Sequence, residues 1–126
     1  MRDDLNKLTG EVIGAAIEVH RVLGPGFLEE VYQDALEVEL NLQGIANKPQ
    51  YPVALKYKNY EVGKGILDFF VADVLVVELK AVENLVPKHK AQVMSYLKMT
   101  QRPLGLLINF NVTLLKDGIQ RIMYTP

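Results

Sequence analysis

The hydrophobic pattern of this chain changes period near residue 50, and this change limits the folds that it can adopt. Apolar residues from Leu5 to Val22 recur at intervals of three and four, which predicts an amphipathic helix over about residues 3–23. The same spacing from Leu28 to Leu40 predicts a second helix. Beyond residue 50, short runs rich in β-branched and aromatic residues are typical of strands. The pattern therefore indicates the α+β (α/β) class.

The second half of the chain predicts a sheet that one helix interrupts. Three runs between residues 51 and 80, YPVALKY, YEVG and GILDFFVADVLVVELK, predict three or four short strands. Pro87 is placed where a helix begins, which predicts a third helix over residues 88–99. LGLLINF, apolar on both faces, and IQRIMY then predict two more strands. With four strands before the third helix, the expected order is α-α-β-β-β-β-α-β-β, a central mixed sheet flanked by helices.

Composition narrows the class of protein further. The 126 residues are 49% hydrophobic and 23% charged, which predicts a single domain over residues 1–126 with its own core. The absence of cysteine excludes disulfides and thiolate metal sites. The formal charge of -1 provides no general attraction for nucleic acid, so a polyanionic partner would need a local patch or a bound cation.

The chain shows no sign of a membrane or a secretory route. None of its apolar runs approaches the roughly 18 residues that span a bilayer. The first ten residues, MRDDLNKLTG, lack an apolar signal core. We therefore expect a cytoplasmic protein with no membrane partner.

The segment VVELK, at the end of a buried strand, carries the strongest chemical signal. Strand side chains alternate, so Glu78 and Lys80 share one face of this strand. If the preceding hairpin folds about Asp73, then Asp68 lies directly opposite Glu78. Opposed residues have β-carbons about 5 Å apart, so two carboxylates would meet beside an ammonium group.

Two carboxylates at this distance repel each other unless a proton or a cation lies between them. A hard divalent ion such as Mg²⁺, held by one or two carboxylates and several waters, removes the repulsion. Lys80 can then act on the attacking water or on the charge that develops in the transition state. The combination indicates metal-assisted phosphodiester hydrolysis. The alternative is a strand end that emerges into solvent, with Asp68, Glu78 and Lys80 as ordinary surface charges.

Two motifs in the sequence resemble those of a known family. The pattern Asp68…Glu78-Leu79-Lys80, between a leading and a following helix, resembles the PD-(D/E)XK nuclease superfamily, although Leu67 stands where proline is common. The segment GFLEEVY, with Gly26, Glu29 and Tyr32 at the named positions, is similar to the small bacterial GxxExxY proteins. The resemblance extends to HKAQVMSYLK and GLLINF, and it implies a restriction-endonuclease-like core.

The resemblance also implies a role for each matching residue. Asp68 and Glu78 would be ligands of Mg²⁺ or Mn²⁺, and the backbone carbonyl of Leu79 would add a third ligand. Lys80 would be the catalytic lysine. Glu29 would assist metal or water binding. As an alternative, Glu29 is a first-turn carboxylate favoured by the helix dipole.

Three further residues would bind or orient the substrate. Gln92 and Tyr96 resemble the QxxxY element of exonuclease-like members, and a separation of four places both on one helix face. Tyr32 lies three residues after Glu29 and shares its helix face. For both tyrosines, packing in the core with the hydroxyl at the rim is an equal alternative. His20 is interpreted as a structural histidine, and His89 as part of a solvated helix start.

These features favour one function and leave two others open. The leading hypothesis is a Mg²⁺-dependent nuclease that acts on DNA or RNA. The second is a non-catalytic, self-associating interaction module on a nuclease scaffold, which the near-neutral charge favours. A sugar or nucleotide hydrolase with the carboxylates as acid and base ranks lowest, because it gives Lys80 no task.

Overall fold

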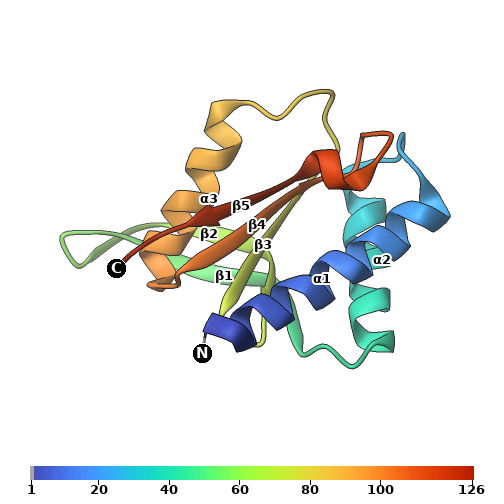
Figure 1. The fold of residues 1–126 in the computed structure, drawn as a ribbon. Coiled ribbons are helices and arrows are strands. Elements are labelled where there is room, and N and C mark those ends of the chain that lie inside the picture. The colour runs from blue at the N-terminus through green and yellow to red at the C-terminus, as the bar shows by residue number, and fades with distance from the viewer. Residues whose placement is uncertain (1) are drawn as a thin grey trace.

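A five-stranded mixed sheet forms the centre of the molecule. The computed structural model describes residues 2–126. Their elements, in order, are α1 (Arg2–Leu23), α2 (Glu29–Leu42), β1 (Asn47–Tyr57), β2 (Tyr60–Val71), β3 (Leu75–Lys80), α3 (Pro87–Thr100), β4 (Leu104–Asn109), the 3-10 helix η1 (Leu115–Gly118) and β5 (Ile119–Met123). The strands lie side by side in chain order, with β3 and β4 parallel and the other neighbours antiparallel (Figure 1).

The helices cover both faces of this sheet. α1 and α2 pack on one face, where Val12 and Leu36 join the core cluster that contains Val77. α3 packs on the other, where Val93 belongs to the cluster around Val76. The expected α+β class, with a mixed sheet flanked by helices, is confirmed. In the described part of the chain, no helix combines the length and the apolar character that crossing a bilayer requires.

The expected strand order is wrong at one point, because three strands and not four precede α3. YEVG and GILDFF form one continuous strand, β2. Glycine usually weakens a strand and suggests a break, but Gly65 has a packing reason. A β-carbon at Gly65 would lie 2.5 Å from Cε1 of Tyr96, so only glycine lets the tyrosine ring lie on the strand.

The β2–β3 hairpin has the register that the alternation predicts. Phe69 pairs with Val77 and Val71 with Leu75, which places Asp68 opposite Glu78. The chain reverses through Ala72 and Asp73, both with positive φ (51° and 56°). Two successive residues with positive φ are what a type I′ turn requires, and its twist suits the flanking strands.

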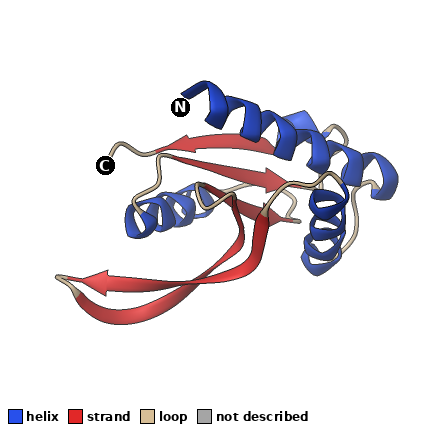
Figure 2. Cartoon of the chain, turned by 90° about the horizontal axis from the view of Figure 1, so that it is seen from below, coloured by secondary structure: helices blue, strands red, loops and turns tan. Residues whose placement is uncertain are grey.

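The hairpin of β1 and β2 bends at the level of Asp68. Leu67 and Phe69 would share a face in a regular strand, yet Leu67 packs in the α3 cluster and Phe69 in the α1–α2 cluster. On β1, Gln50 has a φ of 49°. It is left out of the strand pairing, which passes from Pro49–Phe69 directly to Tyr51–Leu67. Beyond this bend, the two strands first pack against α3 and then extend past the helices as a long hairpin (Figure 2).

Candidate active site

The carboxylates of Asp68 and Glu78 each accept a hydrogen bond from the backbone of the opposite strand in the β2–β3 hairpin. The backbone N–H of Asp68 donates to Oε1 of Glu78 at 3.0 Å. The backbone N–H of Leu79 donates to Oδ2 of Asp68 at 2.7 Å. Glu78 is only 4% exposed, so it does not lie on a strand end that emerges into solvent. The structure thus brings together the two carboxylates that the sequence predicts.

Burial makes the charged form of this pair costly. Desolvation, followed by the negative charge of Asp68, raises the pKa of Glu78 to about 9. Desolvation also raises the pKa of Asp68, against the opposing effects of the Leu79 N–H and the Lys80 charge. A pair of this kind is stable with a proton or a cation between its members.

Lys80 and Glu29 lie beside the pair, on different elements. Lys80 is the last residue of β3, and Glu29 is the first residue of α2. Desolvation raises the pKa of Glu29, the positive charge of Lys80 lowers it, and the negative charge of Asp68 raises it. Glu29 therefore interacts with both groups while its side chain stays open to solvent. Glu29 thus lies in the first turn of α2, as the helix-dipole alternative describes, and it also lies near the carboxylate of Asp68.

α3 contributes Tyr96 and Gln92. Desolvation, followed by the charge of Glu78, raises the pKa of Tyr96, while the Ile66 backbone and the Gln92 side chain, which lie close to its hydroxyl, lower it. Tyr96 is 8% exposed, so most of its ring is packed while the hydroxyl lies at the edge of the site. Gln92 is exposed. Both interpretations of Tyr96, core packing and proximity to the carboxylates, therefore describe it.

Tyr32 lies apart from this group, in the position that the packing alternative describes. It is fully buried, and its ring stacks on Phe110 with the centroids 4.5 Å apart. Its hydroxyl donates to the carbonyl of Gly24 at 2.5 Å and accepts from the N–H of Phe27 at 3.2 Å. Tyr32 thus fixes the turn before α2 and has no exposed surface with which to touch a substrate. In GFLEEVY, Tyr32 has a structural place while Glu29 faces the carboxylates.

Two glutamines outside the predicted site residues also contact Asp68. Nε2 of Gln33 donates to the backbone carbonyl of Asp68 at 3.0 Å. The side chain of Gln50 lies close enough to the Asp68 carboxyl group to lower its pKa. Gln33 follows Glu29 by four residues and shares its helix face, so this spacing could have predicted that Gln33 lies near the site. For Gln50 the sequence holds no such signal, because its φ of 49° is visible only in the structure.

Asn109 holds the chain segment that follows Lys80. It is 2% exposed, and its side-chain amide donates to the carbonyl of Val82 at 2.9 Å while its Oδ1 accepts from the N–H of Val82 at 3.0 Å. The neighbouring Phe110 N–H donates to the carbonyl of Lys80 at 2.9 Å. These bonds fix the end of β3, and with it the backbone that carries Lys80.

The two histidines are not ligands of the carboxylate site. Nε2 of His20 hydrogen-bonds the carbonyl of Val112 at 2.8 Å, as expected for a structural histidine. Nδ1 of His89 accepts from the N–H of Val86 at 3.1 Å, at the start of α3. Desolvation and then the charges of Lys80 and Lys88 lower the pKa of His89, so this helix start lies near Lys80.

The donor set of the site fits Mg²⁺ or Mn²⁺. Mg²⁺ binds oxygen ligands and keeps several waters, so one or two carboxylates are enough protein ligands. Asp68 and Glu78 supply two, and a cation between them would offset the burial and mutual repulsion that raise the pKa of Glu78. Within residues 2–126 no group of three or more His, Asp or Glu is placed to hold a metal ion, so water would complete the coordination.

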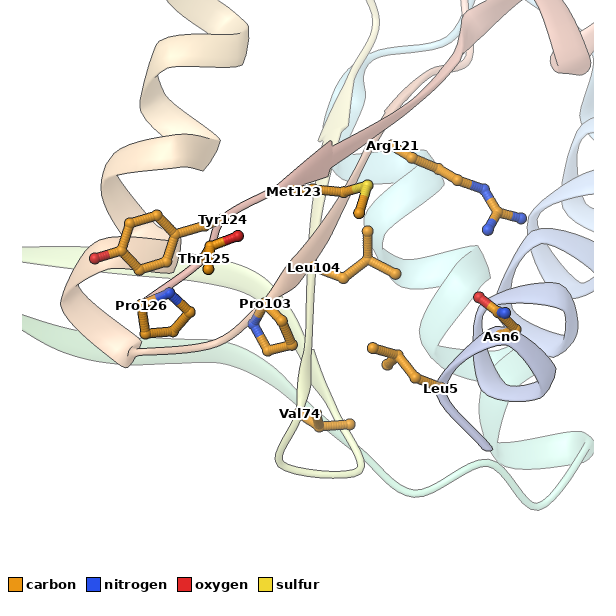
Figure 3. A pocket seen from close by; sticks show the side chains of 10 residues that line it. All are labelled: Leu5, Asn6, Val74, Pro103, Leu104, Arg121, Met123, Tyr124, Thr125 and Pro126. Atoms are coloured by element: carbon orange, nitrogen blue, oxygen red, sulfur yellow. The ribbon is translucent and has the colours of Figure 1, made fainter. Parts of the chain in front are cut away.

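An apolar cavity lies elsewhere in the molecule. A pocket of about 650 Å³ opens between Leu5, Val74, Leu104 and Met123 (Figure 3). Leu104 pairs with the first residue of β3, whereas Lys80 is the last, so the pocket and the carboxylates lie near opposite ends of this strand. This pocket is therefore not part of the carboxylate site.

Comparison with known families agrees with this geometry. The profile of the PD-(D/E)XK nuclease superfamily matches residues 6–122. The match spans nearly the whole chain, and the chain belongs to this superfamily. Its mixed five-stranded sheet and three helices are consistent with the restriction-endonuclease-like fold that the resemblance implied. Searches of the curated proteins and of the solved structures found no significant match.

Proposed function

We propose that this chain is a Mg²⁺- or Mn²⁺-dependent nuclease that hydrolyses phosphodiester bonds of DNA or RNA. The observation that carries the proposal is the pair of the buried Glu78 and the half-buried Asp68, each of which accepts a backbone hydrogen bond across the hairpin next to Lys80. Superfamily membership supports the same reaction class. A divalent ion bound by the pair would supply Lewis-acid activation of the phosphate and a more acidic water.

The residues around the pair have separate tasks in this proposal. Lys80 orients the attacking water and stabilises the negative charge that develops on the phosphate. Glu29 accepts a hydrogen bond from that water on the solvent side. Tyr96, held by Gln92, orients the substrate backbone through its hydroxyl. The backbone carbonyl of Leu79 is a further candidate ligand.

Local positive charge compensates for the overall charge of -1. Lys88, His89 and Lys90 occupy the first turn of α3, which contains no acidic residue. The shift in the pKa of His89 places this turn near Lys80. Phosphate groups that approach Lys80 would therefore meet further cations and the N-terminal end of a helix.

We further propose that the chain belongs to the GxxExxY proteins within the superfamily. Gly26, Glu29 and Tyr32 fill the named positions. Gly26 has a φ of 107°, which favours glycine. Tyr32 fixes the turn and Glu29 lies near Lys80, so each residue of the motif has a physical reason.

A cleavage assay tests the nuclease directly. Labelled single-stranded and double-stranded substrates are incubated with Mg²⁺ or Mn²⁺ and with the wild type, Lys80→Ala or Glu78→Gln. We expect a loss of roughly 100-fold or more in rate for each variant, typical of the removal of one electrostatic stabiliser. Lys98→Ala, an exposed lysine at the far end of α3, is the matched control and should cleave normally. Equal cleavage by all four proteins would reject the proposal.

The second candidate is a non-catalytic interaction module that self-associates. Its support is the apolar surface on β2, where Val62 is 66% and Ile66 51% exposed, together with the near-neutral charge. Sedimentation analysis distinguishes the two functions when it is combined with the cleavage assay. A stable dimer that neither cleaves nucleic acid nor binds a divalent ion would favour the module.

A further inference from the structure

The arm, defined here as residues 54–64, extends past the catalytic end of the sheet. β3 ends at Lys80. Its antiparallel neighbour β2 begins at Tyr60, well beyond the point that lies opposite Lys80. The pairs between β2 and β3 run only from Phe69 to Val71, so the arm part of β2 has β1 as its strand neighbour. Figures 1 and 2 both show the arm standing clear of the helices at its tip.

The arm carries positive charge on a chain that is slightly acidic overall. It contains Lys56, Lys58 and Lys64 and a single acidic residue, Glu61. All four side chains are exposed. The charge of the arm is therefore opposite in sign to that of the whole chain and complementary to a phosphate backbone.

The tip of the arm also exposes two aromatic rings. Tyr57 is 62% and Tyr60 75% exposed, and the two residues pair across the turn at Lys58 and Asn59. The ammonium group of Lys58 lies 5.4 Å from the centroid of the Tyr57 ring. Exposed aromatic rings next to cations are the combination on which unpaired bases stack while the backbone is neutralised.

We propose that the arm binds single-stranded nucleic acid and guides it toward Asp68 and Glu78. This inference rests on the proposed nuclease function and adds the class of substrate. Tyr60 and Asp68 lie on the same strand, eight residues apart, which corresponds to about 26 Å along β2. A strand that stacks on the tip therefore reaches the carboxylates through several nucleotides. A duplex keeps its bases stacked on one another, so the tyrosine rings discriminate against it.

Fluorescence anisotropy with a labelled oligothymidine in EDTA measures binding apart from cleavage. We expect Tyr57→Ala/Tyr60→Ala to weaken binding by about tenfold or more, as removal of a stacking platform does. The triple variant Lys56→Ala/Lys58→Ala/Lys64→Ala should lower the slope of log Kd against log salt by about 2, the effect of three lost contacts on a single strand. Lys98→Ala/Lys116→Ala and Leu42→Ala, exposed residues outside the arm, are the controls and should bind as the wild type does.

Each other outcome has a defined meaning. Equal affinity of the arm variants and the wild type would overturn the inference, as would tighter binding of a duplex than of the single strand. Loss of self-association with unchanged oligonucleotide affinity would overturn it too, and would make the arm a protein contact. Cleavage that depends on Lys80, together with normal binding by the arm variants, would support the nuclease function and reject the role of the arm. Binding through the arm without any cleavage would reject only the nuclease.

Discussion

Glu78 shows how one buried side chain links the strand register to the chemistry. Its carboxylate accepts the N–H of Asp68, so the hairpin needs the oxygen atom. Its negative charge is unfavourable in the same place, because burial and Asp68 raise its pKa to about 9. A cation bound between Glu78 and Asp68 would offset the repulsion that makes this charge unfavourable.

The protonation of Glu78 predicts a pH dependence of stability in the absence of metal. The pKa in the folded chain lies above the ordinary value of 4.5, so the stabilising effect of the proton is complete below pH 4.5 and is lost as the pH rises toward 9. Urea unfolding in EDTA should therefore find the wild type less stable at pH 8 than at pH 5, relative to Glu78→Gln. The amide keeps an acceptor oxygen without a titrating proton. An identical pH profile for the two proteins would contradict this account.

Gln50 combines an unfavourable backbone conformation with a contact to Asp68. A φ of 49° within a strand costs a non-glycine residue about 1 kcal/mol or more. We expect Gln50→Gly to be more stable than Gln50→Ala by about 1 kcal/mol, because only glycine adopts this conformation freely. Both variants lose the amide and should lose a similar fraction of the cleavage rate. Denaturant unfolding and single-turnover rates measure the two effects, and full activity in Gln50→Gly would show that the amide is not needed.

At the scale of the elements, β2 differs most from the sequence prediction. The alternation of side chains and the turn at Asp73 were sufficient to predict that Asp68 faces Glu78, because a hairpin with a short turn fixes its register. The continuity of β2 through Gly63 and Gly65 was not predictable in this way. Strand propensity alone predicts a break at glycine. The tyrosine ring that needs the space at Gly65 belongs to α3, which is distant in the sequence.

The contact between β2 and α3 gives a prediction of its own. In Gly65→Ala the new β-carbon would lie 2.5 Å from Cε1 of Tyr96, so the ring and its helix must shift. Overpacking of this kind costs about 1–3 kcal/mol. Thermal unfolding should show this loss in Gly65→Ala, and a smaller effect of the same substitution in a Tyr96→Ala background. Equal losses in both backgrounds would mean that the ring does not restrict this position.

At the scale of the whole molecule, three elements distant in the sequence meet at one end of the sheet. α2 supplies Glu29, the β2–β3 hairpin supplies Asp68, Glu78 and Lys80, and α3 supplies Tyr96. The sequence predicted these residues through spacing and resemblance. It left open whether Tyr32 joins them, because periodicity places Tyr32 on a helix face but does not say how far that face is covered. The packing of Tyr32 on Phe110 is a tertiary contact between residues far apart in the chain.

Calorimetric titration of Mn²⁺ into the metal-free protein tests the central claim most directly. We expect binding to the wild type with release of a proton near pH 7, because Glu78 must lose its proton to bind the ion. Repeating the titration in buffers of different ionisation enthalpy measures that proton. Asp68→Asn and Glu78→Gln should each lose binding, while Glu39→Gln, a carboxylate on α2 outside the site, should retain it. Wild-type binding that survives both substitutions, or no binding by the wild type, would contradict the account.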